Sequence, residues 1–448
     1  MIQKILIANR GEIAVRIIRA CRELNLSTVA VYSSVDKDSL HVLLADEAIC
    51  IGDHHLSNSY LNQNAILQAC VNSGAHAIHP GYGFLSENAD FARACERMGI
   101  EFIGPSSSLI ELMGDKDKAR QTMKKAGVPT VPGSKGLVND VNEAFENAKH
   151  IGYPLLIKAS AGGGGRGMRL CYEEKDLEHL YLQAVQEAKM AFGNGDVYME
   201  KFIEKPRHIE VQIVADKYGN VAHVFERECS VQRNNQKMIE EAPCTNLTQE
   251  TKNKLYEVSV KAAKEVGYES CGTMEYIMDN QENFYFIEMN TRIQVEHPIS
   301  EMISGVDLIK EQLGIAQGKR LSFKQEDLFA QGVAMELRIT AENPYDNFRP
   351  SSGPLTSVHF PGGYGVRIDS FIYSGYTVLP FYDSMIAKVI LHAKTRDEVI
   401  EKSIRALEEL DIDGIDTNVD FLLEVLLNEK FLDHRYDTSL IQSMLEDR

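Results

Sequence analysis

The first hundred residues alternate between apolar runs and amphipathic stretches. Residues 4–8 form a short apolar run, and Ile13, Ile17 and Cys21 then recur at helical spacing before a second apolar run at 27–32. Runs of this length bounded by polar residues are typical of buried strands, and the spacing between them is typical of a helix. We therefore predict a strand–helix–strand unit with parallel strands and a right-handed crossover.

Two further strands are predicted at about 75–79 and 100–103, which would complete an open α/β domain ending near Gly104 and Pro105. The turn after the first strand contains a single glycine, Gly11. A dinucleotide site needs several glycines so that the backbone can approach a pyrophosphate, so the pattern argues against nicotinamide or flavin binding here.

A boundary rich in proline and glycine follows at 127–133. Beyond it, predicted strands at 153–158 and 169–172 flank a run of four glycines, Gly162 to Gly165. This pattern predicts a second, smaller domain.

From about residue 204 the chain is interpreted as a large α+β domain without internal repeats. Its last clear helix follows Thr395, with Glu398 placed for a capping box and a mostly apolar stripe over 399–410. We interpret that helix as structural.

Composition and charge narrow the functional classes. A length of 448 residues suggests about three domains, and 44% apolar with 25% charged residues excludes collagen-like and disordered chains. The net charge of −18 argues against a broad grip on nucleic acid or anionic lipid. An anionic ligand must therefore meet local positive charge.

The eight cysteines show no C-x-x-C pair, and no apolar run approaches about 18 residues. No charged or apolar leader separates from the first strand. We expect scattered hydrophobic cysteines in a reducing compartment, a cytoplasmic location, and neither nucleic-acid nor membrane partners.

The glycine run has a high entropic cost, so it indicates a backbone that approaches a ligand or a loop that moves. Lys158 precedes it and Arg166 follows it, which favours phosphate as the ligand. A flexible hairpin tip remains the alternative, and the Walker spacing is absent.

Two strands joined by the turn-like segment 279–283 carry a pair of carboxylates. A hairpin centred between Gln281 and Glu282 sets Glu275 directly against Glu288. Opposed carboxylates about 5 Å apart are destabilising unless a cation lies between them.

Asn290 lies two residues after Glu288 and supplies a third hard oxygen. Such a set favours Mg²⁺ or Mn²⁺ shared with a nucleotide over zinc. A solvated acidic face, or a register slipped by two residues, remains the alternative.

We predict that the second strand continues to Pro298, so that its polar side chains share one face by the two-residue period. They are Glu288, Asn290, Arg292, Gln294 and Glu296. The order of these side chains favours catalysis. Metal-type ligands come first, a cation able to hold an oxyanion follows, and a carboxylate placed to act as a base comes last. The alternation alone fits a solvated face equally well.

Other segments add positive charge. They are two alternating strands, 198–203 and 207–212, and a polar basic loop at 232–237.

Taken together, these stretches resemble the biotin carboxylase family of ATP-grasp enzymes over essentially the whole chain. The motifs are IANRGEIAVRIIRA at 7–20, HPGYGFLSEN at 79–88, MGDK at 113–116, IKASAGGGGRGMR at 157–169 and FIEMNTRIQVEHP at 286–298. The resemblance implies a three-part ATP-grasp architecture of mixed α/β and α+β class. Its parts would be an N-terminal α/β domain at 1–113, a helical linker at 114–130, a mobile glycine-rich lid at 131–203 and a C-terminal catalytic domain at 204–448.

The same resemblance implies the ATP-binding residues, with Lys116 and Lys158 on the phosphates. The full set is Lys116, Lys158, Gly162, Gly163, Gly164, Gly165, Met168, Glu200, Lys201, Phe202, Ile203, His208, Gln232, Asn235, Glu275 and Glu288. Two positions depart from the family pattern: Ala161 replaces the first of five glycines, and Asn235 stands where a histidine often contacts the nucleotide. Both departures concern nucleotide affinity.

Further roles follow from the resemblance. Two Mg²⁺ (or Mn²⁺) ions would be bound by Glu275, Glu288 and Asn290. Bicarbonate would be bound by Lys237, Arg292, Gln294 and the Val295 backbone. Glu296 would deprotonate bicarbonate, Arg338 would stabilise the enolate form of biotin, and Tyr82 would cover the biotin ring. The catalytic residues would therefore be Arg292, Glu296, Lys237 and Arg338.

The implied reaction is ATP- and bicarbonate-dependent carboxylation of biotin through carboxyphosphate. We find no Met-Lys-Met attachment sequence, so we expect biotin on a separate carrier protein. The resemblance also implies carboxyltransferase subunits and a homodimer. The expected pathway is the first half-reaction of acetyl-CoA carboxylase, which forms malonyl-CoA for fatty acid synthesis. Alternatives are a pyruvate or other acyl-CoA carboxylase, another ATP-grasp ligase that joins a carboxylate to an amine, or a nucleotide-binding regulatory subunit without turnover.

Overall fold

A computed structural model of the protein describes residues 2–159, 168–192 and 195–447. The predicted glycine run, Gly162 to Gly165, lies outside the described residues. The described chain divides into two compact units. Unit 1 comprises Met1–Val128, Arg207–Tyr276 and Glu288–Arg448, and unit 2 comprises Pro129–Pro206 and Ile277–Ile287.

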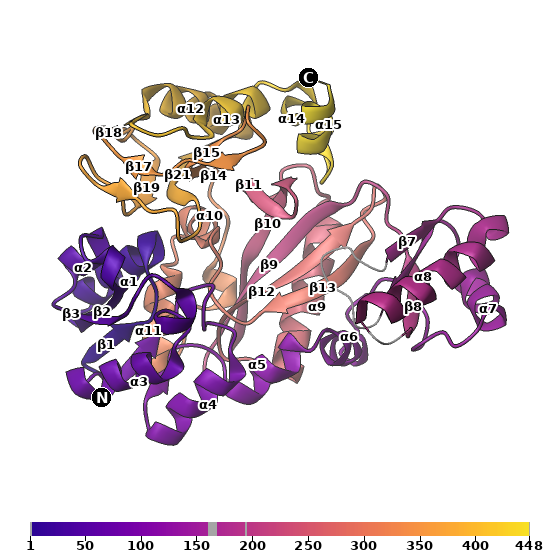
Figure 1. The fold of residues 1–448 in the computed structure, drawn as a ribbon, viewed down its shortest axis with the longest axis horizontal. Coiled ribbons are helices and arrows are strands. Elements are labelled where there is room, and N and C mark those ends of the chain that lie inside the picture. The colour runs from indigo at the N-terminus through magenta and orange to yellow at the C-terminus, as the bar shows by residue number, and fades with distance from the viewer. Residues whose placement is uncertain (1, 160–167, 193–194, 448) are drawn as a thin grey trace. The chain divides into compact units, whose positions relative to one another are not determined.

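The N-terminal part of unit 1 is a five-stranded sheet in the order β3-β2-β1-β4-β5, with every pair parallel. Figure 1 labels β1, β2 and β3 of this sheet. Its strands are β1 (Lys4–Ile7), β2 (Ser27–Ser33), β3 (Glu47–Gly52), β4 (Ala77–His79) and β5 (Glu101–Phe102). The helices of this region are α1 (Gly11–Glu23), α2 (Leu40–Leu44), α3 (Gln63–Ser73), α4 (Ala89–Met98), α5 (Ser107–Gly114) and α6 (Lys116–Lys125). The predicted parallel unit and the two later strands are confirmed.

The strand order reverses between β1 and β4, because β1 pairs with β2 on one side and with β4 on the other. Open α/β sheets bind ligands at the carboxyl ends of the strands at such a switch point. Here the ends carry Asn9 to Glu12 and His79 to Tyr82. The Asn9 side-chain amide donates to the carbonyls of Pro80 and Tyr82, both at 2.7 Å, so the two loops are joined.

The centre of unit 1 is formed mainly by an eight-stranded sheet in the order β13-β12-β9-β10-β11-β14-β21-β19. Its strands are β9 (Arg207–Ala215), β10 (Val221–Arg233), β11 (Gln236–Ala242), β12 (Ser270–Met278), β13 (Phe284–Asn290), β14 (Val333–Thr340), β19 (Val366–Ser370) and β21 (Met385–Ala393). The helices packed around it are α9 (Gln249–Glu265), α10 (His297–Ser304), α11 (Leu308–Ala316), α12 (Arg396–Glu409) and α13 (Val419–Leu426).

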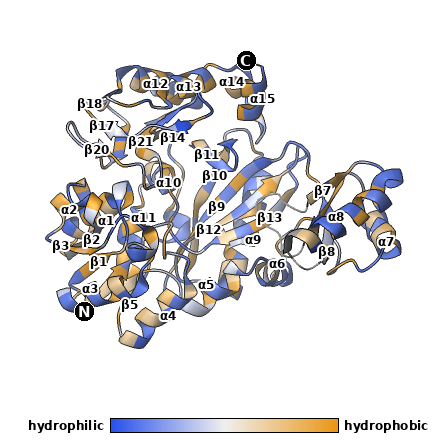
Figure 2. Cartoon of the chain, in the orientation of Figure 1, coloured by the Kyte–Doolittle hydropathy of each residue, from blue (hydrophilic) through white to orange (hydrophobic). Residues whose placement is uncertain are grey.

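The two faces of this sheet bury different side chains. Ala334 of β14 and Ile390 of β21 cluster with Ile299 of α10. Their sequence neighbours Met335 and Val389 belong to another cluster, which includes residues of α12 and α13. Successive strand residues point to opposite faces, so α10 covers one face and α12 with α13 the other. Figure 2 shows both hydrophobic and hydrophilic residues on α12, as expected for a helix with one packed side.

The helix predicted after Thr395 is α12. The Thr395 hydroxyl accepts a hydrogen bond from the Glu398 N–H at 3.3 Å, as an N-cap does. Val399, Ser403 and Leu407 of its stripe are buried. The small elements around it are β15 (Glu342–Asn343), β16 (Arg349–Pro350), β17 (Gly353–Pro354), β18 (Ser357–His359), β20 (Thr377–Val378), β22 (Asp411–Asp413), α14 (Glu429–Leu432) and α15 (Leu440–Glu446).

Unit 2 is built on a three-stranded antiparallel sheet, β7-β6-β8, against which α7 and α8 pack. Its elements are α7 (Val141–Ile151), β6 (Leu155–Ala159), β7 (Met168–Cys171), α8 (Leu177–Phe192) and β8 (Val197–Lys201). Strands β6 and β7 flank the glycine run as predicted, and their pairing sets Lys158 against Met168.

The prediction that one strand continues to Pro298 is wrong. Strand β13 ends at Asn290, and α10 begins at His297. Pro298 occupies the first turn of α10. Backbone N–H groups in the first turn of a helix have no partner within the helix, so the N–H that proline lacks is not missed there. The intervening residues 291–296 are therefore an irregular segment.

The turn before β13 also differs from the prediction. The Asp279 N–H donates to the Asn283 carbonyl at 2.9 Å, so the turn is centred on Gln281, and Glu282 has a φ of +61°. A one-residue shift moves side chains to the other face of a strand. The direct opposition of Glu275 and Glu288 stays a prediction.

The predicted basic loop at 232–237 is a tight hairpin turn. Strand β10 continues to Arg233 and β11 begins at Gln236, which pair with each other. Asn234 and Asn235 have φ values of +51° and +64°, as a two-residue type I′ turn requires. An Asn-Asn pair is a hairpin signal, because asparagine tolerates this conformation.

Two further expectations concern the whole chain. All eight cysteines lie among the described residues and are free, as predicted. Within the described ranges, no helix is both long enough and apolar enough to cross a membrane.

Candidate active site

Glu275 is the central carboxylate of a buried polar network in unit 1. It lies on β12 and is 7% exposed. Its Oε1 accepts hydrogen bonds from Asn290 Nδ2 at 2.8 Å and from Gln294 Nε2 at 2.6 Å, and Lys237 Nζ lies 3.3 Å away. Three residues predicted for two different ligands therefore meet at one oxygen.

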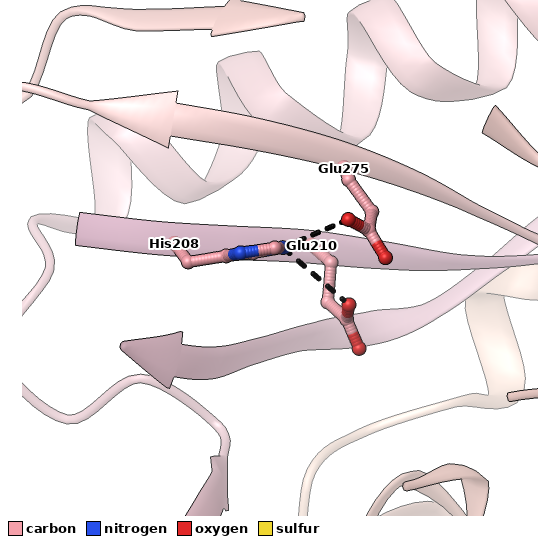
Figure 3. Close-up of side chains that lie close together, drawn as sticks. All are labelled: His208, Glu210 and Glu275. Atoms are coloured by element: carbon pink, nitrogen blue, oxygen red, sulfur yellow. Dashed lines mark ion pairs between the residues drawn. The ribbon is translucent and has the colours of Figure 1, made fainter. Parts of the chain in front are cut away.

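The second oxygen of Glu275 faces β9. His208 Nε2 lies 3.0 Å from Glu275 Oε2 and 4.0 Å from Glu210 Oε2 (Figure 3). Burial alone would raise the pKa of Glu275, but the Lys237 ammonium and the His208 ring outweigh it and hold the pKa well below its usual range. Glu275 is therefore ionised at neutral pH.

Glu296 is the second carboxylate of the network and is 2% exposed. Lys237 Nζ donates to one of its oxygens, and Arg338 Nη2 donates to the other at 2.9 Å. Burial would raise the pKa of Glu296, but Lys237, Arg338 and Arg227 hold it well below its usual range. Glu296, the predicted base, is thus ionised. Its two cationic partners, Lys237 and Arg338, are themselves residues predicted to bind substrates.

The two cations have further acidic partners. Lys237 Nζ donates to Glu210 at 2.7 Å, and Arg338 Nε donates to Glu240 at 2.6 Å. Burial alone would lower the pKa of Lys237, but the surrounding anionic groups raise it well above the ordinary value. Burial raises the pKa of Glu240 to about 7 despite its contact with Arg338.

Arg292 follows β13 and joins the network at its outer side. Its Nη2 donates to Asn290 Oδ1 at 2.8 Å, and its Nε donates to Glu87 Oε2 at 2.8 Å. Glu87 also accepts from the Thr291 N–H at 3.1 Å. In the sequence Glu87 is one residue of the motif at 79–88, and no local pattern marks it as the partner of an arginine 205 positions later.

Arg227 is a functional candidate that the sequence patterns did not single out. It lies on β10, is 0% exposed, and contacts Glu210. It also donates to Gln212 Oε1 at 2.7 Å and to Gln294 Oε1 at 2.6 Å, so it fixes the Gln294 amide. A charged residue in an otherwise buried strand was the available signal.

The predicted metal ligands are brought together in part. Asn290 contacts Glu275, and Glu288 lies two residues before Asn290 on β13, on the same face by the strand period. The Glu288 side chain is 38% exposed, and its Oε2 lies 3.6 Å from Lys116 Nζ. Among the described residues, Glu288 belongs to neither compact cluster of metal-type ligand atoms, one of which is His208, Glu210 and Glu275.

The predicted ligands nevertheless have the chemical groups that a divalent cation requires. Glu275 is ionised, and carboxylate and amide oxygens are the ligands that Mg²⁺ and Mn²⁺ prefer. Glu275, Glu288 and Asn290 would hold it.

Unit 2 carries the remaining described candidates for nucleotide binding. Lys158 Nζ contacts the Glu200 carboxylate across the sheet. Lys201 Nζ donates to the Tyr153 carbonyl at 2.6 Å, and the Phe202 N–H donates to a backbone carbonyl at 3.0 Å. Ile203 is buried, whereas Met168 is exposed.

Three other candidates lie elsewhere in unit 1. Gln232 is buried on β10 opposite Lys237, whereas Asn235 is exposed at the hairpin turn. Tyr82 is half-buried, and its hydroxyl donates to Glu12 Oε1. These positions leave the roles of Gln232, Asn235 and Tyr82 as predictions.

Three family models match successive parts of the chain. They are the biotin carboxylase N-terminal domain over residues 1–110, the carbamoyl-phosphate synthase L chain ATP-binding domain over 115–324, and the biotin carboxylase C-terminal domain over 336–443. Biotin carboxylase 1 of Bacillus subtilis (strain 168) is 54% identical over 444 residues, which cover 99% of each chain. The chain belongs to the biotin carboxylase family. It has the ATP-grasp biotin carboxylase fold, and it is a biotin carboxylase, an ATP-grasp ligase.

Other members of the family agree with this assignment. The biotin carboxylase of Haemophilus influenzae is 56% identical over 432 residues, covering 96% of each chain. The biotin carboxylase domain dimer of Hydrogenobacter thermophilus 2-oxoglutarate carboxylase, solved with MgADP, ADP and bicarbonate, superposes with a TM-score of 0.90 at 51% identity, covering 99% of this chain and 98% of that one. The biotin carboxylase subunit of a pyruvate carboxylase superposes with a TM-score of 0.91 at 51% identity, covering 100% and 99%.

Proposed function

We propose that this biotin carboxylase uses ATP and bicarbonate to carboxylate biotin presented by a separate carrier protein, through carboxyphosphate. The observation that carries the proposal is the buried Glu296 carboxylate hydrogen-bonded to both Lys237 and Arg338. One ionised acid between two cations provides a base for one substrate and positive charge for both.

In the first step, Lys237, Arg292, Gln294 and the Val295 backbone would bind bicarbonate, and Glu296 would remove its proton. A carboxylate paired with two cations is a weak base, because its pKa is low. Bicarbonate that takes over contacts of Lys237 would weaken that pairing and so make Glu296 a stronger base. The bicarbonate oxygen then attacks the γ-phosphorus, which gives carboxyphosphate and ADP.

Several residues would neutralise or contact ATP. Lys116 and Lys158, with the glycine run, would bind the phosphates. Glu200, Lys201, Phe202 and Ile203 would line the adenine pocket, with Met168 and Asn235 as further nucleotide contacts, and His208 and Gln232 would lie on the ribose side. A divalent cation held by Glu275, Glu288 and Asn290 would add positive charge against the phosphate oxygens.

In the second step, carboxyphosphate would release CO₂ and phosphate beside biotin. Phosphate would take the N1 proton of the ureido group, and Arg338 would offset the charge that develops on the ureido oxygen. Tyr82 would cover the ring. Burial of Arg338 among acids keeps it protonated, because the neighbouring carboxylates outweigh the burial that alone would lower its pKa.

We propose the domain borders stated above, 1–113, 114–130, 131–203 and 204–448, with 131–203 as a lid that excludes water from carboxyphosphate. The separate compact unit at Pro129–Pro206 supports the lid. Support for a homodimer comes from the dimeric Hydrogenobacter relative.

For the pathway we propose the first half-reaction of acetyl-CoA carboxylase in the cytoplasm. The name of the Bacillus relative, Biotin carboxylase 1, supports the biotin half-reaction. The names of the 2-oxoglutarate and pyruvate carboxylase relatives make those two acceptors the alternatives.

The reaction is tested by ATP hydrolysis with and without bicarbonate and free biotin. We expect hydrolysis that depends on bicarbonate and is stimulated by biotin. Arg292→Ala should abolish it while the protein stays folded, whereas the exposed control Arg349→Ala should retain it. Hydrolysis indifferent to bicarbonate and biotin would instead identify another ATP-grasp ligase, and absence of turnover a regulatory subunit.

The pathway is tested by affinity isolation from the native source. The co-purifying biotinylated carrier and transferase should carboxylate acetyl-CoA when added to this protein with ATP and bicarbonate. Carboxylation of pyruvate or 2-oxoglutarate instead would replace the acetyl-CoA assignment without affecting the biotin half-reaction.

A further inference from the structure

Lys388 of β21 is a fully buried cation that no step above uses. Its side chain is 0% exposed. The Nζ donates to the Val295 carbonyl at 2.7 Å and lies 3.1 Å from Glu12 Oε1. Burying an ammonium group is costly unless it is paired and hydrogen-bonded. These two contacts, together with the nearby Glu336 and Asp369 carboxylates, make its burial tolerable.

The sheet places Lys388 beside the active site. Lys388 is directly opposite Arg338 on β14 and Asp369 on β19, and opposed residues share a face. Asp369 is engaged by the Arg367 guanidinium at 2.7 and 3.0 Å. The Lys388 ammonium is thus directed to the segment before α10 on the face that carries Arg338.

The segment that Lys388 contacts has no strand ladder to fix its backbone, since residues 291–296 lie between β13 and α10. Side-chain contacts hold it instead: His297 Nδ1 lies 2.7 Å from the Gln294 carbonyl, and Lys388 holds the next carbonyl, that of Val295. The peptide group is planar, so holding this carbonyl also orients the N–H of Glu296. Lys388 thereby restricts the backbone that aims both Val295 and Glu296.

The other partner of Lys388 leads to the N-terminal sheet. Glu12 lies in the first turn of α1, and the Oε1 that faces Lys388 also accepts a hydrogen bond from the Tyr82 hydroxyl. Tyr82 and Glu12 follow β4 and β1, on either side of the switch point. A continuous chain of contacts therefore runs from Tyr82 through Glu12 and Lys388 to Val295.

We propose that Lys388 is a positioning residue that holds the Val295–Glu296 peptide in the conformation that binds bicarbonate, and that Glu12 ties this conformation to Tyr82. The inference rests on the proposed function, in which Val295 binds bicarbonate and Tyr82 covers biotin. Lys388 touches neither substrate and acts through the backbone.

The first test is the steady-state kinetics of Lys388→Met in the biotin-free, bicarbonate-dependent ATPase reaction. Loss of a hydrogen bond to a charged donor should raise KM for bicarbonate about tenfold, while KM for ATP stays within about twofold. Lys388→Arg, which keeps a charged donor, should restore most of the affinity. The matched control is Lys252→Met. Lys252 Nζ lies 2.9 Å from the buried Glu226 carboxylate, and neither residue belongs to the chain of contacts described above.

The second test addresses the link to Tyr82 without removing a buried charge. Tyr82→Phe deletes only the hydroxyl that contacts Glu12, and it should raise KM for bicarbonate about threefold even in the absence of biotin. A residue that only covers biotin would leave this value unchanged. In the double variant with Lys388→Met, Tyr82→Phe should cause no further rise in KM for bicarbonate, because both substitutions break the same chain of contacts.

Wild-type activity separates the two levels of failure. Absence of bicarbonate-dependent hydrolysis in the wild type would overturn the proposed function. Its presence, with KM for bicarbonate unchanged in Tyr82→Phe and in whichever Lys388 variants fold, would overturn the positioning role alone. Equal changes in KM for ATP and bicarbonate would likewise reduce Lys388 to a structural residue.

Discussion

Buried cations of the active site each contact a carboxylate. Arg227 contacts Glu210, Lys237 contacts Glu296, and Lys388 contacts Glu12. Removing one member of such a pair leaves the other charge buried alone, at a cost of about 3–5 kcal/mol. The stability of each variant at these positions must therefore be measured together with its activity.

Glu296→Gln keeps the shape of the side chain but removes the base. We expect kcat for bicarbonate-dependent ATP hydrolysis to fall by about 10²–10⁴, measured against Glu226→Gln. Glu226 is also a fully buried glutamate, on β10, but its partners are Cys244, Lys252 and Tyr256. A fall of the same size in both variants would show loss of folding rather than loss of the base.

His41 provides a pH-dependent test of the fold. It is fully buried, and burial lowers its pKa to about 4. Between its ordinary value of 6.5 and 4 the unfolded chain binds a proton that the folded protein does not, so the free energy of unfolding falls as the pH falls. His41→Gln should remove about 1.4 kcal/mol per pH unit of this slope, measured by urea unfolding.

The control for that measurement is His76→Gln. The His76 side chain is exposed, so this variant removes a histidine without disturbing a buried position. An unchanged slope in His41→Gln would contradict the assignment of acid sensitivity to this histidine.

Among the elements, those that depend on local pattern were predicted correctly, whereas the centre of the turn before β13 and the end of β13 were not. Strand β1, the strands flanking the glycine run and α12 follow from apolar runs, spacing and a cap. The turn before β13 is centred on Gln281 rather than between Gln281 and Glu282, and β13 ends at Asn290. Alternation cannot show where a strand stops, because an irregular segment such as 291–296 can carry the same alternation.

The β10–β11 turn allows a test at this scale. Asn235 has a φ of +64°, a region that costs most residues about 1–2 kcal/mol. Asn235→Val should lower the free energy of unfolding by that amount, and Asn235→Gly should leave it nearly unchanged. If Asn235 binds nucleotide as proposed, Asn235→Gly should raise KM for ATP without loss of stability; equal KM values would remove Asn235 from the nucleotide site.

Over the whole molecule, nucleotide candidates lie in both compact units. A ligand that binds the folded state at 100 times its Kd stabilises it by about 2.7 kcal/mol. A non-hydrolysable ATP analogue with Mg²⁺ should therefore raise the melting temperature, and removal of Mg²⁺ with a chelator should reduce that rise.

Lys158→Met should reduce the rise further, because Lys158 is proposed to contact the phosphates. Lys149→Met is the control in the same unit, since Lys149 is 63% exposed and pairs with Glu146 on α7. An equal rise in both variants would argue against phosphate contact by Lys158.

The sequence by itself determined the segments, the residue types and, through its motifs, the family. Alternation and spacing are local properties, and the motifs place chemically competent side chains at recognisable positions. The pairing of Arg292 with Glu87, the burial of Arg227 and the path from Tyr82 through Glu12 and Lys388 to Val295 were decided only by tertiary structure. Those contacts join residues up to several hundred positions apart, and hydrogen-bond partners across such distances are fixed by how sheets and helices pack rather than by any local pattern.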